Sequence, residues 1–287
     1  MGLVLLQAGE FAQLDGLVHG FSTRNGGDSV LDSKAVFNLG STEWDSSEAL
    51  QANRARLLAA LDARAMSLVT LRQRHTDIIH VVRKIPAGSL RGDALITRRP
   101  GLLLAVQTAD CVPILLADVR RRVVAAVHAG WRGTLRRIVQ KTVGRMRMEM
   151  GTHPRDIVAA LGPAIGRCCY EVGPEVVTAF AAQFAAARDW FDGPFEPLAR
   201  GEEATPLPWL SQTPPGHPPS PPRAQLDLHA ANRWQLLDAG VPAGAIVASD
   251  LCTACRTDFL FSHRRERGRT GRMMAVIGIL PEGTAAR

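Results

Sequence analysis

The sequence predicts an α/β fold, and two stretches indicate it most clearly. Val123 to Leu135, VVAAVHAGWRGTL, begins with small and β-branched apolar residues, passes through a glycine-rich turn and leads into an amphipathic run that opens at Thr134. This order of residues predicts a buried strand, a sharp turn and a helix. Leu102 to Asp118 predicts two further apolar strands. The polar break Gln107 to Pro113 predicts a bend between them, because proline has no N–H for a central ladder.

Other segments continue this alternation of strands and helices. Ser46 to Ala63 carries leucines and alanines at helical spacing, with Ser46 or Ser47 as the expected N-cap and Glu48 in the first turn. The alanine-rich segment that starts at Pro174 is a further expected helix. Short apolar segments bounded by turns are expected as strands. They are Leu17 to Thr23, Ile157 to Leu161, Ile246 to Leu251 and, in a hairpin-like ending, Thr270 to Ile279.

The composition limits the class of protein. A chain of 287 residues that is 46% hydrophobic is expected to be globular with a substantial core. Its longest apolar runs are far shorter than the roughly 20 residues that span a bilayer. The N-terminus has no basic segment before its short apolar stretch, which does not fit a signal peptide. We therefore expect a cytoplasmic protein with no membrane partner.

The charge and the cysteines exclude two further classes. The net charge is +7 and the pI is near 9.8, but the arginines are spread along the chain and few aromatic residues could stack on bases. We expect no nucleic-acid partner. The five cysteines cannot all pair, and Cys252-x-x-Cys255 lacks a second C-x-x-C that would complete a structural zinc site. The adjacent Cys168 and Cys169 are expected to form neither a disulfide nor a metal clamp.

One segment interrupts the α/β pattern. Prolines crowd Phe191 to Pro222, where they exclude a helix or a central strand. Because the helical pattern resumes directly after it, we interpret residues 192–222, approximately, as a surface insertion.

Three residues stand out on independent local grounds as site candidates. His75 lies in a bend, Cys111 lies in the break between two strands, and His128 lies at the junction of strand and turn. Asp93, at the start of an expected strand, could face the same crevice. Two imidazoles and a thiolate suit zinc with one position left for water or substrate. The same residues could instead form a nucleophilic pair in which His128 activates Cys111, and spacing does not decide between the two.

Longer motifs carry a resemblance to a known family. In chain order they are RQRHTD, GDALIT, TADCVPILLAD, VHAGWRGTL, GPAIGRCCYEV, DLHAANRWQL, LCT and FSHRRERGRTGR, with FSTRNGG and FNLG near the start. Together they span about residues 17 to 279 and resemble the YfiH-like family. That family was once labelled multicopper polyphenol oxidases or laccase-domain proteins, and its members are now regarded as purine nucleoside phosphorylases. The proline-rich stretch around Glu203 to Pro222 departs from the pattern, and His263 stands where the family has tyrosine or histidine.

The resemblance implies a single domain over residues 1–287, built of layered mixed β-sheets flanked by helices in four layers. It implies zinc bound by His75, Cys111 and His128. It also implies phosphorolysis of adenosine, inosine, guanosine and methylthioadenosine, with deamination of adenosine as a second reaction. Purine nucleosides and phosphate are then the partners. The copper-oxidase label fits less well, because laccase-type sites need H-x-H pairs and none of the eight histidines forms one.

Roles for other residues are hypotheses at this point. Asp110 and Glu171 are candidates for acid–base catalysis, and Asp110 could equally orient a ligand histidine. Arg24, Arg132 and Arg264 are candidates for binding phosphate, because the guanidinium fork matches its oxygens. Two other functions stay open. One is a Cys-His hydrolase or amidase acting on cell-wall precursors. The other is a non-enzymatic interaction protein in which zinc only stabilises the fold.

Overall fold

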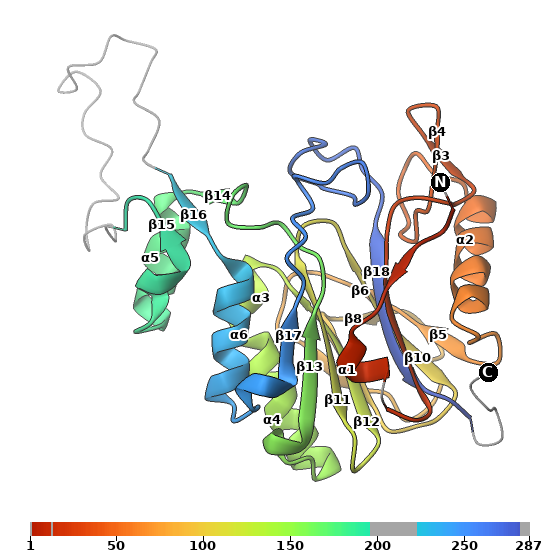
Figure 1. The fold of residues 1–287 in the computed structure, drawn as a ribbon, viewed down its shortest axis with the longest axis horizontal. Coiled ribbons are helices and arrows are strands. Elements are labelled where there is room, and N and C mark those ends of the chain that lie inside the picture. Colours follow the sequence, from red (N-terminus) through yellow and green to blue (C-terminus); the bar gives the residue numbers. More distant parts are fainter. Residues whose placement is uncertain (1, 13, 196–222, 282–287) are drawn as a thin grey trace. The chain divides into compact units, whose positions relative to one another are not determined.

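The structure, a computed structural model, describes residues 2–12, 14–195 and 223–281 (Figure 1). Its contacts divide the chain into two compact units. The main unit comprises Met1–Gly166 and Leu228–Arg287, and the small unit comprises Arg167–Asp227. The proposed insertion at about 192–222 lies almost entirely outside the described residues. The organisation as a single domain therefore stays a prediction.

Two mixed sheets form the centre of the main unit. The five-stranded sheet has the order β1-β2-β18-β10-β5 and is antiparallel except for the pair β10 and β5. Its strands are Leu5–Leu6, Leu17–Ser22, Met273–Ile279, Leu102–Thr108 and Ser67–Val69, in that order. The six-stranded sheet has the order β17-β13-β11-β12-β9-β7. Its strands are Ile246–Ala248, Ile157–Leu161, Val112–Asp118, Val123–Ala129, Ala94–Thr97 and Ile79–Val81.

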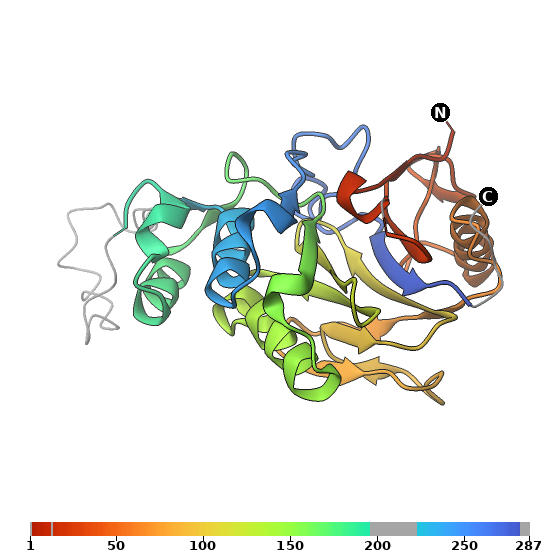
Figure 2. The same cartoon turned by 60° about the horizontal axis from the view of Figure 1, so that its bottom comes forward.

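The main unit has four layers, as the resemblance implies. The two sheets bury one core between them, which includes Leu104 and Ile277 from the first sheet and Leu115 and Val124 from the second. Helix α2 (Ser47–Ala60) packs on the outer face of the five-stranded sheet. Helices α3 (Trp131–Leu135), α4 (Ile138–Met150) and α6 (Leu228–Asp238) lie together on the other side, where α4 packs on β12 and α6 on β17 (Figure 2). The predicted α/β fold of mixed sheets flanked by helices is confirmed.

Short elements complete the main unit. They include the helix α1 (Gly9–Ala12), the antiparallel pair β3 (Ser29–Leu31) and β4 (Lys34–Val36), and the parallel pair β6 (Leu71–Arg72) and β8 (Leu90–Arg91). Two 3-10 helices, Pro154–Asp156 and Ala243–Ala245, also belong to it. Among the described residues, no helix combines the length and the apolar character that crossing a lipid bilayer requires.

The small unit is built around aromatic residues. Its sheet has the order β14-β16-β15, with strands Glu171–Val172, Ala224–Leu226 and Phe191–Asp192, and its helix α5 covers Pro174–Gln183. Phe180 of α5 contacts three rings, those of Phe184, Trp190 and Phe191, with centroids 5.7 to 6.3 Å away. These edge-to-face and tilted contacts bury large apolar surfaces beside the smaller buried residues of the unit, such as Val176, Val177 and Leu226.

Two local predictions around the opening stretch are wrong. The predicted single helix from Thr134 is two helices, because α3 already begins at Trp131 and Arg137 adopts a left-handed conformation (φ 60°) before α4. Pro113 lies within the central strand β11, opposite His128, rather than in a bend. It fits there as the second residue of the strand, where its carbonyl still accepts the N–H of Gly162 at 2.8 Å.

The N-terminus of α2 gives a test of the fold. The Ser46 hydroxyl accepts the N–H of Ala49 at 3.1 Å, so Ser46→Ala should lower the free energy of unfolding by about 1 kcal/mol. Ser47→Ala is the control, because that hydroxyl contacts Glu48 on the surface and should change stability by less than about 0.5 kcal/mol. Denaturant titration measures both variants. Equal effects would contradict the assignment of Ser46 as the cap.

Candidate metal centre

Three predicted ligands meet at one end of the sheets. His75 follows β6, Cys111 lies between β10 and β11, and His128 is the next-to-last residue of β12. One ligand atom from each residue lies within 4.8 Å of the others. The Cys111 Sγ lies 3.7 Å from His75 Nε2, and the two imidazole rings meet edge to face with centroids 5.0 Å apart. The fold thus brings together residues that are far apart in the sequence.

The three candidate ligands differ in their exposure to solvent. His75 is exposed, Cys111 is half-buried and His128 is only 4% exposed. Strand β12 holds His128 in the interior, between β11 and β9, whereas His75 projects from a bend in which its own φ is 57°. A small molecule could therefore reach the three ligand atoms past His75.

Asp93 connects two of the ligands and is itself fully buried. Its carboxylate accepts the backbone N–H groups of Arg74, His75 and Thr76 and the Thr76 hydroxyl, at 2.7 to 3.2 Å. The Nδ1–H of His128 also donates to it, at 2.9 Å. This bond turns His128 Nε2 toward Cys111, which is the arrangement that a ligand histidine needs. The sequence placed Asp93 near the crevice, but gave no sign that it holds both histidines.

The electrostatics of the centre favour charged forms of its groups. Burial alone would raise the pKa of Asp93, but the hydrogen bonds from His128 and Thr76 hold it well below its usual range. Burial would also raise the pKa of Cys111, yet the charge and hydrogen bonds of His128 and His75 lower it to about 6. For His128, burial is outweighed by Cys111 and Asp93, which raise its pKa to about 9. Both pKa shifts favour the charged pair, a Cys111 thiolate beside a His128 imidazolium.

Gly130 leaves room at the centre. A Cβ at this position would lie 2.8 Å from Cys111 Sγ and 3.0 Å from His75 Cδ2. The φ of Gly130 is −78°, so the backbone does not require glycine and the restriction is one of space. The nitrogen and sulfur donors and this side-chain-free cradle together fit a transition metal that prefers soft ligands.

The other predicted site residues have defined surroundings. Asp110, with φ 91°, lies next to Cys111, and its carboxylate accepts the Thr253 hydroxyl at 2.7 Å and the Arg264 N–H at 2.6 Å. It thereby fixes the loop 253–264 to the segment that carries Cys111. Arg132 stacks over Trp131, 4.3 Å from the ring centroid.

Arg24 and Glu171 have ion-pair partners. The Arg24 guanidinium donates to Glu266 at 3.0 Å and to the carbonyls of Thr257 and Leu260. It therefore holds the loop that follows Cys255. Glu171 lies in the small unit, where it pairs with Arg223 at 3.1 Å. The catalytic and phosphate-binding roles of Asp110, Glu171, Arg24, Arg132 and Arg264 stay predictions.

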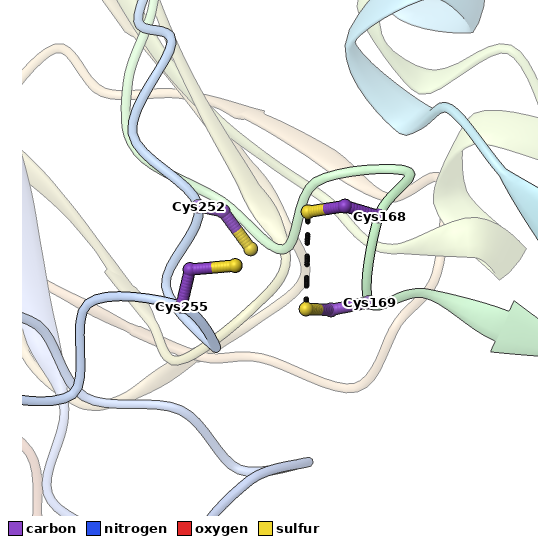
Figure 3. Close-up of side chains that lie close together, drawn as sticks. All are labelled: Cys168, Cys169, Cys252 and Cys255. Atoms are coloured by element: carbon purple, nitrogen blue, oxygen red, sulfur yellow. Dashed lines mark hydrogen bonds between the residues drawn. The ribbon is translucent and has the colours of Figure 1, made fainter.

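Figure 3 draws the four other cysteines, two from each unit. In the main unit, the sulfurs of Cys252 and Cys255 point toward each other, and the N–H of Gly166 donates to Cys252 Sγ at 3.2 Å. In the small unit, Cys168 Sγ donates to Cys169 Sγ over 3.8 Å, along the dashed line. None of these four cysteines forms a disulfide.

The cradle at Gly130 gives a test of the metal centre. Gly130→Ala should reduce the bound metal to well below one ion per chain, because the added methyl group occupies the space between Cys111 and His75. Gly144→Ala in α4 is the matched control, since a Cβ there meets nothing within 4 Å. It should keep the metal and add up to about 1 kcal/mol of stability. Elemental analysis and thermal unfolding measure both variants. Full metal content in Gly130→Ala would contradict this geometry.

Comparison with known proteins places this centre in context. The sequence model of the family described as multi-copper polyphenol oxidoreductase laccase matches residues 18–280. A purine nucleoside phosphorylase from Deinococcus radiodurans is 41% identical, over 97% of this chain and 94% of that protein. An adenosine deaminase, RL5, from an unknown prokaryotic organism is 35% identical, over 94% of this chain and 97% of that protein.

Solved structures share the fold. The crystal structure of YlmD from Geobacillus stearothermophilus is 36% identical and superposes with a TM-score of 0.78, covering 98% of this chain and 97% of that one. The crystal structure of the Bacillus licheniformis protein YfiH is 32% identical and superposes with a TM-score of 0.79, covering 96% of each chain. The relatives named above for an activity are enzymes that act on purine nucleosides, and their names support an enzyme of this kind here. The chain belongs to the multi-copper polyphenol oxidoreductase laccase family, which includes YfiH-like and YlmD-like proteins.

Proposed function

We propose that this protein is a zinc-dependent purine nucleoside phosphorylase acting on adenosine, inosine, guanosine and methylthioadenosine, with deamination of adenosine as a second reaction. The observation that carries the proposal is a group of three possible metal ligands, one of them exposed, in a chain whose relatives are named for these two activities. Zinc suits the donor set, because it binds imidazole and thiolate in three-ligand sites that keep a position for water or substrate.

His75, Cys111 and His128 would hold the metal. When bound in such a set, zinc supplies Lewis-acid activation of water or of a substrate oxygen. Asp93 keeps the Nδ1–H of His128 occupied, so that only Nε2 is presented to the centre.

The two reactions need different groups from the protein. In phosphorolysis, a phosphate oxygen forms a bond to the anomeric carbon of the ribose, the glycosidic bond breaks, and the leaving purine takes up a proton. This requires a cationic site for phosphate, for which Arg24, Arg132 and Arg264 were the candidates from the sequence. In deamination, water adds at C6 and ammonia leaves, which requires an acid–base group such as Asp110 or Glu171. The hydrogen bonds that Asp110 accepts suit a carboxylate that positions the loop around the centre.

A second candidate function has a specific observation in its favour. The low pKa of Cys111 and the raised pKa of its neighbour His128 are those of a cysteine nucleophile with a histidine base. A hydrolase or amidase of this type would work without metal. Alkylation of Cys111 would abolish its activity, whereas removal of the metal would leave it intact.

Removal of the thiolate ligand tests the proposed function. Cys111→Ala should lose the metal and lower phosphorolysis and deamination together, each by more than about 100-fold. Cys255→Ala, an exposed cysteine of the same unit, is the control and should retain both activities. Elemental analysis and nucleoside assays with and without phosphate measure these effects. Phosphorolysis that persists in a metal-free Cys111→Ala protein would exclude a shared zinc mechanism.

The pKa shifts predict how metal affinity depends on pH. Zinc binds neutral imidazole and thiolate. Above about pH 6 the Cys111 thiolate is already formed, whereas His128 keeps its proton up to about pH 9 and must release it on binding. The apparent affinity for zinc should therefore rise about tenfold per pH unit between these values and level off above them. Competition with a chelator at pH 6.5, 7.5 and 8.5 measures it. An affinity that does not change over this range would refute the charged pair.

A further inference from the structure

Arg272 lies at the same end of the five-stranded sheet as Cys111. It directly precedes β18, whose first residue, Met273, pairs with Thr108, the last residue of β10. The chain runs from Thr108 through two residues to Cys111. The register of these two strands therefore places Arg272 beside the segment that carries the thiolate ligand.

The backbone of Arg272 is fixed independently of its side chain. Its N–H donates to Asn38 Oδ1 at 2.8 Å, and its carbonyl accepts the N–H of Leu39 at 3.0 Å. Removing the guanidinium would leave both bonds in place. The position can therefore be tested by substitution with little disturbance of the fold.

The guanidinium of Arg272 is half-buried and has donors to spare. Among the described residues it makes one hydrogen bond, from Nη1 to the Gly271 carbonyl at 2.9 Å, and no ion pair. Among the described residues, the N–H groups on Nε and Nη2 have no protein acceptor. Arg24 differs, since its guanidinium is paired with Glu266.

Arg272 interacts electrostatically with Cys111 and Asp110. Burial lowers the pKa of Arg272, and the negative charges of Cys111 and Asp110 oppose this shift. The guanidinium is thus close enough to the centre to interact with both, and arginine keeps its charge at any ordinary pH. A partly desolvated cation that lacks an ion pair favours binding of an anion.

Gly40 makes space for Arg272 and for a neighbouring amide. A Cβ on Gly40 would lie 2.6 Å from Cβ and Cγ of Arg272 and 2.9 Å from Gln107 Oε1. The backbone of Gln107 is held by Gln73, which donates to its carbonyl and accepts its N–H, both at 2.7 Å. Its side-chain amide makes no hydrogen bond among the described residues and supplies further N–H donors. A guanidinium fork and an amide thus lie together beside the Cys111 segment.

We propose that Arg272 binds the phosphate co-substrate at this centre, with Gln107 as its neighbouring donor. This inference rests on the proposed phosphorolysis. It assigns phosphate to a residue other than the three arginines that the sequence suggested. A guanidinium matches two phosphate oxygens at once, which holds the nucleophile in one orientation.

The test compares phosphate use with phosphate-independent chemistry in the full-length, zinc-loaded protein. Arg272→Gln should raise the KM for phosphate in inosine phosphorolysis by about 10- to 100-fold. The ratio of phosphorolysis to adenosine deamination should fall by a similar factor, because deamination uses water instead. Arg272→Lys should be intermediate, since it keeps the charge without the fork. Millimolar guanidine should partly restore phosphorolysis in Arg272→Ala, which loss of a structural residue would not permit.

The control and a direct binding measurement complete the design. Arg147→Gln removes the same charge from the exposed last turn of α4, and should leave the KM for phosphate unchanged. That helix ends beside Arg121 in the β11–β12 turn, at the opposite end of β11 from Cys111. Calorimetric titration of inorganic phosphate into wild type and Arg272→Gln reports binding without turnover. Weaker binding in the variant supports the site even if wild type cleaves no nucleoside, an outcome that would defeat only the proposed function. Equal phosphate binding and equal KM in both proteins would overturn the role of Arg272.

Discussion

The site depends on the buried carboxylate of Asp93. It accepts the Nδ1–H of His128 from a strand and three successive N–H groups from the bend that carries His75. A bend with a positive φ at His75 would be costly without such compensation. The two candidate histidine ligands are therefore not independent, because the Asp93 side chain fixes the orientation of His128 and the backbone conformation at His75. Loss of the Asp93 charge would release both at once.

The layers of the main unit explain why this arrangement is rigid on one side. His128 lies in β12, which is paired on both edges and covered by α4 on one face and by the five-stranded sheet on the other. Cys111 lies in the connection between β10 of the five-stranded sheet and β11 of the six-stranded sheet. The two sheets thus supply one ligand from the interior and one from their junction, while the third comes from a surface bend.

Much of the main unit could be predicted from local patterns, but the links between its parts could not. Helix α2 and its Ser46 cap follow from spacing and capping chemistry. The three candidate ligands stand out in the sequence at a bend, at a break between strands and at a junction of strand and turn, and the structure brings them together. The role of Asp93 depends on N–H groups presented by a bend whose conformation no glycine or asparagine signals. The break before α4 was missed for the same reason, since an arginine adopts the left-handed conformation there. The partners of Arg24 come from a loop more than 230 residues away in the chain.

The three candidate ligands are buried to different degrees. Exposure falls from His75 through Cys111 to His128, so His75 is the candidate ligand most open to solvent. If the proposed function holds, a nucleoside bound against His75 would cover the residue through which an ion at the centre is most exposed. Bound substrate would then slow exchange of the metal.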